Sequence, residues 1–234
     1  MRFEAAAGSE VGHRYTANFD VLHLTTEPLL AVVADGMGDS EGSALAGRAT
    51  VDTVVAGLAG DVTPDLIRTV VARAQETVTE IGRQDVGLAG CTLTALTGAA
   101  DGLWIVQLGD SRVYRLRGTL LELLTVDHTM AWLGAVHGWY PFDSPQANAA
   151  RYHLTRYVGH PEQPAPDILN VVPRLGDVFL LCTDGLAEQV EYARMAEILA
   201  TRAPERAVRE LLDAADAAGG QDNATAVVVS AERV

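Results

Sequence analysis

Five aspartates stand at the ends of apolar segments, where they could do chemistry together. Three of them, Asp35, Asp110 and Asp184, lie at the ends of LLAVVADG, LWIVQLGD and VFLLCTDG. The other two lie at the start of apolar segments, with Asp222 shortly before ATAVVVSA and Asp20 as the first residue of DVLHL. In four cases a glycine lies within three residues, where the backbone can turn tightly and approach a ligand. Strand ends that converge would therefore bring several carboxylates to one rim of the fold.

An Asp-Gly pair is also ordinary turn chemistry, and this alternative has to be weighed for each aspartate. Asp101-Gly102 is interpreted as a turn and nothing more. A surface turn does not need a fully buried strand before it. The apolar residues that precede Asp35 and Asp184 therefore favour a carboxylate cluster.

Clustered carboxylates need compensation for their negative charge. Two of them about 4 Å apart repel by roughly 4 kcal/mol at an effective dielectric near 20, so either some are protonated or cations hold them. Ligands that are all oxygen select Mg²⁺, Mn²⁺ or Ca²⁺ over Zn²⁺, and no EF-hand spacing is present. A pair of such ions can activate a bridging water for attack on phosphorus.

The charge composition excludes several classes of function. The chain has 234 residues and a net charge of -14, and all 17 basic residues are arginine. A nucleic-acid partner is therefore not expected. The absence of lysine excludes a P-loop lysine, a Schiff base and a kinase-type phosphate lysine. Cys91 and Cys182 lie far apart in apolar segments and are expected to be buried free thiols.

The chain reads as one domain over residues 1–234, since no repeat, linker or shift in composition divides it. No run of 18 apolar residues is present, and an acid follows closely on the first residue, where a signal peptide needs apolar residues. We expect a soluble, cytoplasmic monomer with no membrane partner.

The first part of the chain predicts three strands and two helices. The strands are expected near 2–8, 19–25 and 29–34, and the helices over 41–58 and 64–82. Asp39 or Ser40 could cap the first helix. Thr63 followed by Pro64 is typical of a helix start.

The rest of the chain repeats this alternation. Short β-branched and aromatic segments between 90 and 124, joined by tight turns, predict antiparallel strands. Residues 130–165 look like an irregular, flap-like surface excursion. A strand at 177–183, helices at 191–201 and 204–218 and a last strand, ATAVVVSA, follow. This order predicts an α+β fold, an antiparallel sandwich with helices outside both sheets.

Six motifs in order resemble those of one known family. They are GHRYTANFD (12–20), VVADGMG (32–38), CTLTAL with LGDSR (108–112), LTRYVG (154–159), LLCTDGL (180–186) and GGQDNATAVVV (219–229). Together they resemble the metal-dependent serine/threonine protein phosphatases of the PPM, or type 2C, family in their compact bacterial form. The resemblance implies a four-layer α-β-β-α sandwich with two Mn²⁺ or Mg²⁺ ions in a cleft between two antiparallel sheets.

By this resemblance, Asp35 bridges both ions and the Gly36 carbonyl binds one of them. Asp184 and Asp222 are the implied remaining ligands of the first site. Asp20 is implied as a ligand or as a catalytic acid that orients water. Asp110 is similar to the residue that forms a third, weaker metal site with Asp184 in bacterial members. A hydroxide between the ions would attack phosphorus without a phosphoenzyme.

The sequence departs from the family pattern at two positions. An arginine that clamps phosphate usually stands where this chain has Tyr15, and Arg14, one residue earlier, is the candidate for that catalytic role. Met37 takes the place of a histidine general acid in animal relatives, so metal-bound water or another residue would protonate the leaving group. His128 is expected to have a hydrogen-bonded structural role.

The implied activity is hydrolysis of phosphoserine or phosphothreonine in proteins, with kinases or kinase substrates as partners. One alternative is a phosphatase dedicated to a single regulatory partner. Another is a catalytically weak module that only binds a phosphorylated partner. A cluster that retains Asp35, Asp184 and Asp222 argues against the last alternative, because burying unpaired carboxylates is costly. Arg112, Arg115 and Arg117 are expected on a solvated face.

Overall fold

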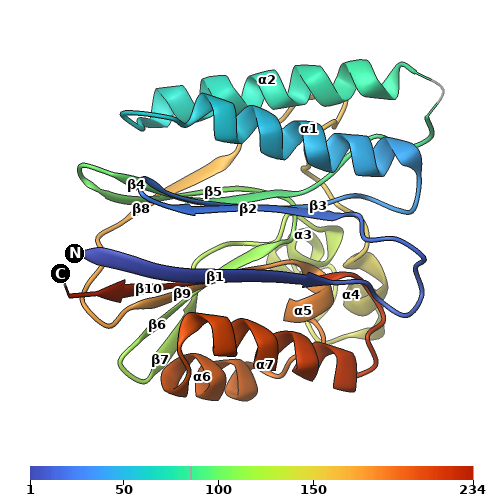
Figure 1. The fold of residues 1–234 in the computed structure, drawn as a ribbon. Helices are drawn as coiled ribbons and strands as arrows, with labels where there is room; N and C mark the ends of the chain where they lie inside the picture. The colour runs from blue at the N-terminus through green and yellow to red at the C-terminus, as the bar shows by residue number, and fades with distance from the viewer. Residues whose placement is uncertain (85, 234) are drawn as a thin grey trace.

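Two five-stranded sheets lie face to face in the computed structural model, which describes residues 1–84 and 86–233 (Figure 1). Neighbouring strands in both sheets are antiparallel. The first sheet contains, in spatial order, β1 (Arg2–Glu10), β10 (Ala224–Glu232), β9 (Val178–Cys182), β6 (Arg112–Arg117) and β7 (Leu120–Leu123). The second contains β2 (Asp20–Thr26), β3 (Leu29–Asp35), β4 (Leu93–Ala99), β5 (Gly102–Leu108) and β8 (Asp167–Val171).

A helix pair covers the outer face of each sheet. The helices α1 (Glu41–Gly57) and α2 (Pro64–Gly82) lie on the second sheet, and α6 (Tyr192–Thr201) and α7 (Pro204–Ala217) lie on the first (Figure 1). The four layers confirm the predicted α-β-β-α sandwich. Within the described residues, no helix combines the length and the apolar character that a bilayer-spanning segment requires.

The two helices of the first pair begin at side-chain caps. Ser40, and not Asp39, accepts the backbone N–H of Ser43 at the start of α1. Thr63 accepts the N–H of Leu66 at the start of α2, and Pro64 is its first residue, as the sequence predicted. Each cap satisfies one of the N–H groups that a helix start leaves without a backbone partner.

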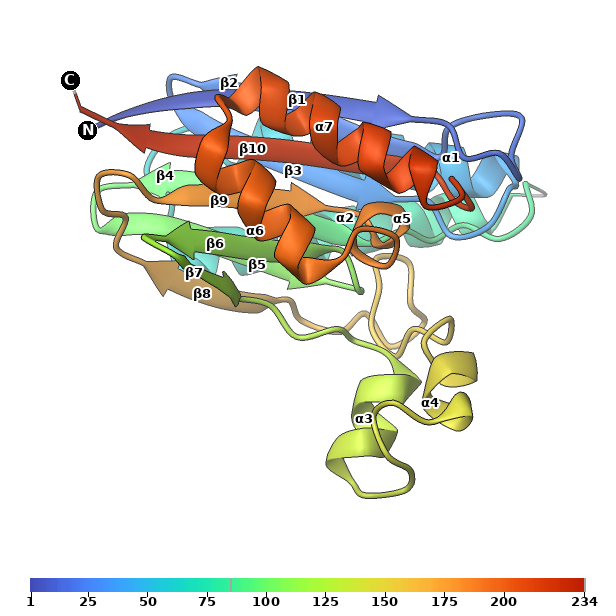
Figure 2. The same cartoon turned by 90° about the horizontal axis from the view of Figure 1, so that it is seen from below.

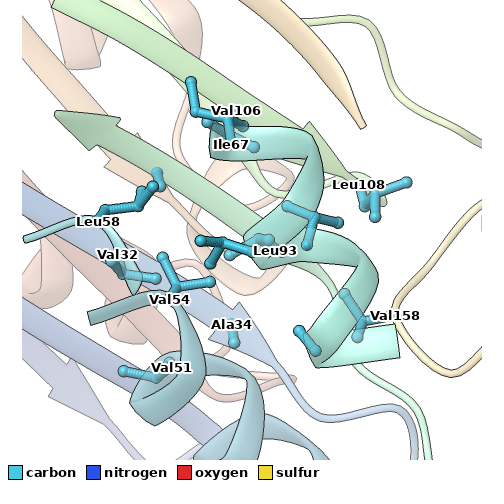
Figure 3. Packing of buried hydrophobic residues seen from close by; sticks show 14 of the residues in the cluster. Val32, Ala34, Val51, Val54, Leu58, Ile67, Leu93, Val106, Leu108 and Val158 are labelled. Carbon is cyan, nitrogen blue, oxygen red and sulfur yellow. The ribbon is translucent and has the colours of Figure 1, made fainter. Parts of the chain in front are cut away.

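The apolar run of β3 is buried on both faces, which explains why it does not alternate with polar residues. Val32 and Ala34 pack under α1 and α2, where Val54 and Ile67 meet Leu93 of β4 (Figure 3). The alternate β3 residues, Leu29, Ala31 and Val33, face the other sheet and join the inner core. Other buried members of this core are Leu96, Phe179, Leu181, Val227 and Val229. Successive strand residues point to opposite faces, so each face of β3 supplies one core.

Three parts of the chain differ from the prediction. The edge strand β8 was not predicted, because its residues alternate between exposed and partly buried and prolines flank it. The excursion at 130–165 is not wholly irregular, since it contains the short helices α3 (Met130–Val136) and α4 (Pro145–Ala150), which project from the sandwich (Figure 2). A single turn of helix, α5 (Asp184–Ala187), follows β9 directly.

The arginines of β6 also differ from the prediction. Arg112, Arg115 and Arg117 do not form a solvated face, because each is ion-paired and their side chains are only 14–26% exposed. The cysteine prediction is confirmed. Cys91 and Cys182 are buried free thiols, and burial raises the pKa of each to about 12.

Candidate functional site

The ends of strands from both sheets meet at one side of the sandwich. Asp20 opens β2 directly opposite Asp35, the last residue of β3. Residues paired directly across strands point to the same face, and Asp35 continues the alternating series of β3 residues that face the first sheet. Asp184 follows β9 and Asp222 precedes β10, the two adjacent strands of that sheet. Both sheets therefore contribute carboxylates to the space between them.

These strand ends surround a cavity of about 280 Å³. Four of the five predicted aspartates line it, and the fifth, Asp20, lies buried beside Asp35. The lining residues are Tyr15, Asp35, Gly36, Met37, Gly38, Leu88, Thr92, Asp110, Tyr152, Leu154, Asp184, Asp222 and Asn223.

Asp20 is held by two hydroxyl groups from the opposite sheet. Its Oδ2 accepts hydrogen bonds from Thr183 Oγ1 at 2.9 Å and from Thr225 Oγ1 at 2.6 Å. Its Oδ1 is buried and has no donor among the described residues. Burial, together with the charges of Asp184 and Asp222, outweighs these hydrogen bonds and raises the pKa of Asp20 to about 8.

Asp35 and Gly36 are fixed through their backbone. The Asp35 N–H donates to Thr92 Oγ1 at 2.9 Å, and the Thr92 N–H donates back to the Asp35 carbonyl at 2.8 Å. A Cβ at position 36 would lie 2.9 Å from the carbonyl oxygens of Phe19 and Ser43, so only glycine fits there. The strand end therefore has one fixed position relative to its neighbours.

The four aspartates that line the cavity resist ionisation as well. Burial is the largest cause of the raised pKa of Asp35 and of Asp110, and neighbouring carboxylates add to it. Burial and the charges of Asp222 and Glu188 raise the pKa of Asp184 to about 6, although a hydrogen bond from Asp35 acts in the other direction. Burial also raises the pKa of Asp222, against the opposing effects of the Asn223 N–H and Arg14. This is the crowding that the sequence predicted.

The donor set fits divalent cations. Every candidate ligand is an oxygen, and Asp184 Oδ1, like Asp20 Oδ1, is buried without a hydrogen-bond donor among the described residues. Hard cations such as Mg²⁺ and Mn²⁺ prefer such ligands. No three acidic, histidine or cysteine side chains of the described chain are grouped closely enough to hold an ion as they stand.

The predicted phosphate-binding arginine does not lie in the cavity. Arg14 is exposed and is not a lining residue, although its charge lowers the pKa of Asp222. Tyr15 lines the cavity instead. Burial, followed by the charge of Asp222, raises the pKa of Tyr15, so its hydroxyl stays protonated at neutral pH.

His128 has the structural role that the sequence predicted. Its Nδ1 accepts the Gly109 N–H at 3.1 Å, so its Nε2 carries the proton and donates to Asp167 Oδ2 at 3.0 Å. This network fixes the residue before Asp110 and connects it to β8. Burial is the main cause of its lowered pKa, which keeps His128 neutral.

Three supporting residues, Thr92, Thr183 and Asn223, were not predicted from the sequence. Each lies next to a quoted motif or inside it, but a threonine or asparagine near a strand end has no distinctive spacing. Asn223 Oδ1 accepts the Gly12 N–H at 3.0 Å, a contact across 211 residues. Only the folded structure reveals such partners.

Comparison with known proteins identifies the family. The family model described as protein phosphatase 2C matches residues 16–218. The chain belongs to the protein phosphatase 2C family. It is 32% identical over 209 residues to the serine/threonine protein phosphatase PstP of Mycobacterium tuberculosis, covering 85% of this chain and 40% of PstP. This phosphatase 2C chain thus spans about two fifths of the length of the PstP relatives that it matches.

Two further comparisons cover nearly the whole length of both chains. A solved structure of PppA, described as a key regulatory component of T6SS in Pseudomonas aeruginosa, has a TM-score of 0.88 and 32% identity and covers 99% of this chain and 98% of that one. The serine/threonine phosphatase stp of Listeria innocua is 27% identical, over 94% of this chain and 91% of its own length. The phosphatase 2C fold therefore extends across the described chain.

Proposed function

We propose that this phosphatase 2C chain hydrolyses phosphoserine and phosphothreonine in proteins and requires divalent metal ions. The observation that carries the proposal is the convergence of Asp35, Asp110, Asp184 and Asp222 on one cavity. Their raised pKa values and the unpartnered carboxylate oxygens support cation binding there. Solved relatives support it too, since one PstP structure is described as a complex with 2 manganese ions.

The proposed ligands are the cavity aspartates and one backbone group. Asp35, the Gly36 carbonyl, Asp184 and Asp222 would hold two ions, Mn²⁺ or Mg²⁺, and Asp110 with Asp184 would hold a third. Bound there, such ions supply positive charge for the phosphate and lower the pKa of a water molecule enough for it to act as a nucleophile.

The protein's own residues keep the carboxylates in place for this chemistry. Thr183 and Thr225 fix the orientation of Asp20 through its Oδ2 and leave its buried Oδ1 as an acceptor for a ligand or an ordered water. Thr92 fixes the end of β3 and with it Asp35. We propose that this arrangement reduces the reorganisation that substrate binding requires.

Substrates and setting follow from the same proposal. The substrates are phosphorylated proteins, either kinases or kinase substrates, and a monomer acts in the cytoplasm. Residues 1–234 form one catalytic domain, in which the α3 and α4 excursion is a flap beside the cavity, because Tyr152 and Leu154 of this segment line it.

Turnover of p-nitrophenyl phosphate and of a phosphothreonine peptide tests the proposal. Each substrate is offered with Mn²⁺, with Mg²⁺ and with EDTA. We expect turnover with Mn²⁺ or Mg²⁺ and none with EDTA. Binding of the phosphopeptide without turnover under every condition, or turnover that EDTA leaves unchanged, contradicts the proposal.

A further inference from the structure

The cavity has an excess of acceptors over donors. Four of its lining residues are aspartates, and no arginine lines it within the described chain. A phosphate monoester is a dianion with three terminal oxygens that accept hydrogen bonds. Cations can neutralise the carboxylates, but an oriented substrate also needs donors from the protein. The lining side chains that can donate are those of Tyr15, Thr92, Tyr152 and Asn223.

Tyr15 is the best placed of the three hydroxyl donors. Thr92 Oγ1 is already engaged with the Asp35 N–H and with Ser111 Oγ at 2.8 Å. Tyr152 is 72% exposed, so little holds its ring in one position. Tyr15 is partly buried, and its hydroxyl has no hydrogen-bond partner among the described residues. It is free to donate to a ligand.

The segment that carries Tyr15 is clamped to the segment that carries Asp222. Gly12 donates its N–H to Asn223 Oδ1 at 3.0 Å, and the His13 N–H donates to the Gly220 carbonyl at 2.7 Å. A Cβ at position 12 would lie 2.3 Å from the backbone carbon of Asp222, so glycine is required for this approach. The loop after β1 and the segment before β10 thus position Tyr15 in the same cavity as the carboxylates.

Two further contacts hold Tyr15 itself. Its N–H donates to the Gly12 carbonyl at 3.0 Å, which closes a tight turn. Its ring packs edge-on against Phe19, with ring centroids 6.1 Å apart, and the Phe19 carbonyl in turn accepts the Gly36 N–H at 3.2 Å. The phenol is therefore tied to both proposed ligand segments, the one at Gly36 and the one at Asp222.

We propose that the Tyr15 hydroxyl donates a hydrogen bond to a phosphoryl oxygen of the substrate and is a phosphate-binding residue of this chain. This assignment rests on the proposed function and deepens it. We assign this contact to Tyr15 rather than to Arg14, which is exposed and does not line the cavity.

Tyr15→Phe removes the hydroxyl and keeps the ring, and Tyr192→Phe is the matched control at a tyrosine of α6 that does not line the cavity. With Mn²⁺ and p-nitrophenyl phosphate, we expect Tyr15→Phe to raise KM about 10- to 100-fold, the factor that corresponds to one hydrogen bond to a charged group. Calorimetry should show inorganic phosphate binding to the Mn²⁺-loaded variant weakened by a similar factor. The affinity for Mn²⁺ and the melting temperature without phosphate should not change in Tyr15→Phe, and Tyr192→Phe should keep the KM and the phosphate affinity of the wild type.

The outcomes separate this assignment from the proposed function. Wild-type protein that hydrolyses neither substrate overturns both. Wild-type turnover together with an unchanged KM and unchanged phosphate affinity in Tyr15→Phe overturns the role of Tyr15 alone. A variant that loses Mn²⁺ affinity or melts at a lower temperature also overturns it, because the hydroxyl would then serve the cluster or the fold.

Discussion

Two sets of acidic residues in this protein differ in whether arginines neutralise their charge. On the first sheet, Asp127, Glu122 and Asp177 each accept two or more hydrogen bonds from an arginine of β6. The four aspartates that line the cavity and the neighbouring Asp20 have no arginine or histidine within 4.0 Å anywhere in the described chain. The acids of the first set are ion-paired, as buried charged side chains almost always are, and the aspartates of the second set are not.

The pKa shifts follow this difference. Burial alone would raise the pKa of Asp177, but hydrogen bonds from Arg117 and the Arg174 N–H outweigh it, and its pKa is lowered. At Asp35 burial acts with neighbouring negative charges, and its pKa is raised. A fold with 17 arginines could pair its buried acids, so the unpaired set is best explained by a positively charged ligand.

The largest expected effect comes from removing one unpaired charge. Asp35→Asn keeps the shape of the side chain but takes away an anionic oxygen from the proposed ion site. We expect turnover with Mn²⁺ to fall more than about 100-fold, the upper end of what outer-shell partners of metal ligands cost. The protein without ions should be no less stable, because the substitution relieves repulsion. Initial rates and thermal melting with and without Mn²⁺ measure both effects.

Asp222→Asn is the companion variant, since Asp222 reaches the cavity from the other sheet. It should also lose turnover and gain less stability from added Mn²⁺ than the wild type does. Rates like those of the wild type in both variants would show that the cavity is not the site of catalysis.

Removing an ion-paired acid should lower the stability of the protein and leave its turnover unchanged. The Asp177 side chain is only 1% exposed and binds Arg117 at 2.6 Å. Asp177→Ala leaves this arginine without its partner, so we expect a loss of about 2 to 3 kcal/mol in the free energy of unfolding, below the full cost of breaking a fully buried pair. Turnover should not change. Urea unfolding and initial rates test the two statements, and a stable variant with reduced turnover would contradict both.

The two sets of acids also show what the sequence could predict. Asp35 and Asp184 were found because each follows an apolar strand that places it at a rim, and this depends only on local pattern. The four layers of the sandwich followed from the alternation of strand and helix segments along the chain. The pairing of Arg117 with Asp177 was not predictable, because the two residues are 60 positions apart and the antiparallel pairing of β6 with β9 brings them together.

The sequence indicated which segments form the site, but not which of two neighbouring residues reaches the cavity. Arg14 and Tyr15 are neighbours in sequence, and which of them reaches the cavity depends on the clamp between Gly12 and Asn223, a contact that no local pattern indicates. The strand β8 was missed for a related reason. Its pairing to β5 comes from tertiary contacts, and its half-exposed residues give a weak signal.

A smaller effect is expected when the melting temperature is measured at a series of pH values, because the pKa of Asp20 is raised whereas that of the ion-paired Asp177 is lowered. The pKa of Asp20 is about 8 in the folded chain and 3.8 ordinarily, so as pH rises from 4 to 8 the unfolded chain ionises while the folded chain resists. The contribution of Asp20 to the free energy of unfolding therefore falls as pH rises and is lost once the pH passes about 8. We expect the melting temperature without ions to fall over this range, and the stabilisation by Mn²⁺ to grow.

Asp20→Asn is the control for the pH series, because it removes the titrating group and keeps an acceptor for Thr183 and Thr225. Its melting temperature should depend less on pH than that of the wild type. An identical pH dependence in the two proteins would assign the effect to other groups.

The smallest effect is expected at Asp101, which shares the Asp-Gly pattern but lies exposed in the turn between β4 and β5. The constraint there falls on Gly102, whose φ is +137° and whose Cβ would lie 2.6 Å from the Val171 carbonyl oxygen. Asp101 only accepts a hydrogen bond from Trp104 Nε1 at 3.1 Å. Asp101→Asn should change stability by less than about 0.5 kcal/mol and leave turnover unchanged. A loss of turnover like that of Asp35→Asn would mean that a buried lead-in strand does not distinguish functional aspartates from turn aspartates.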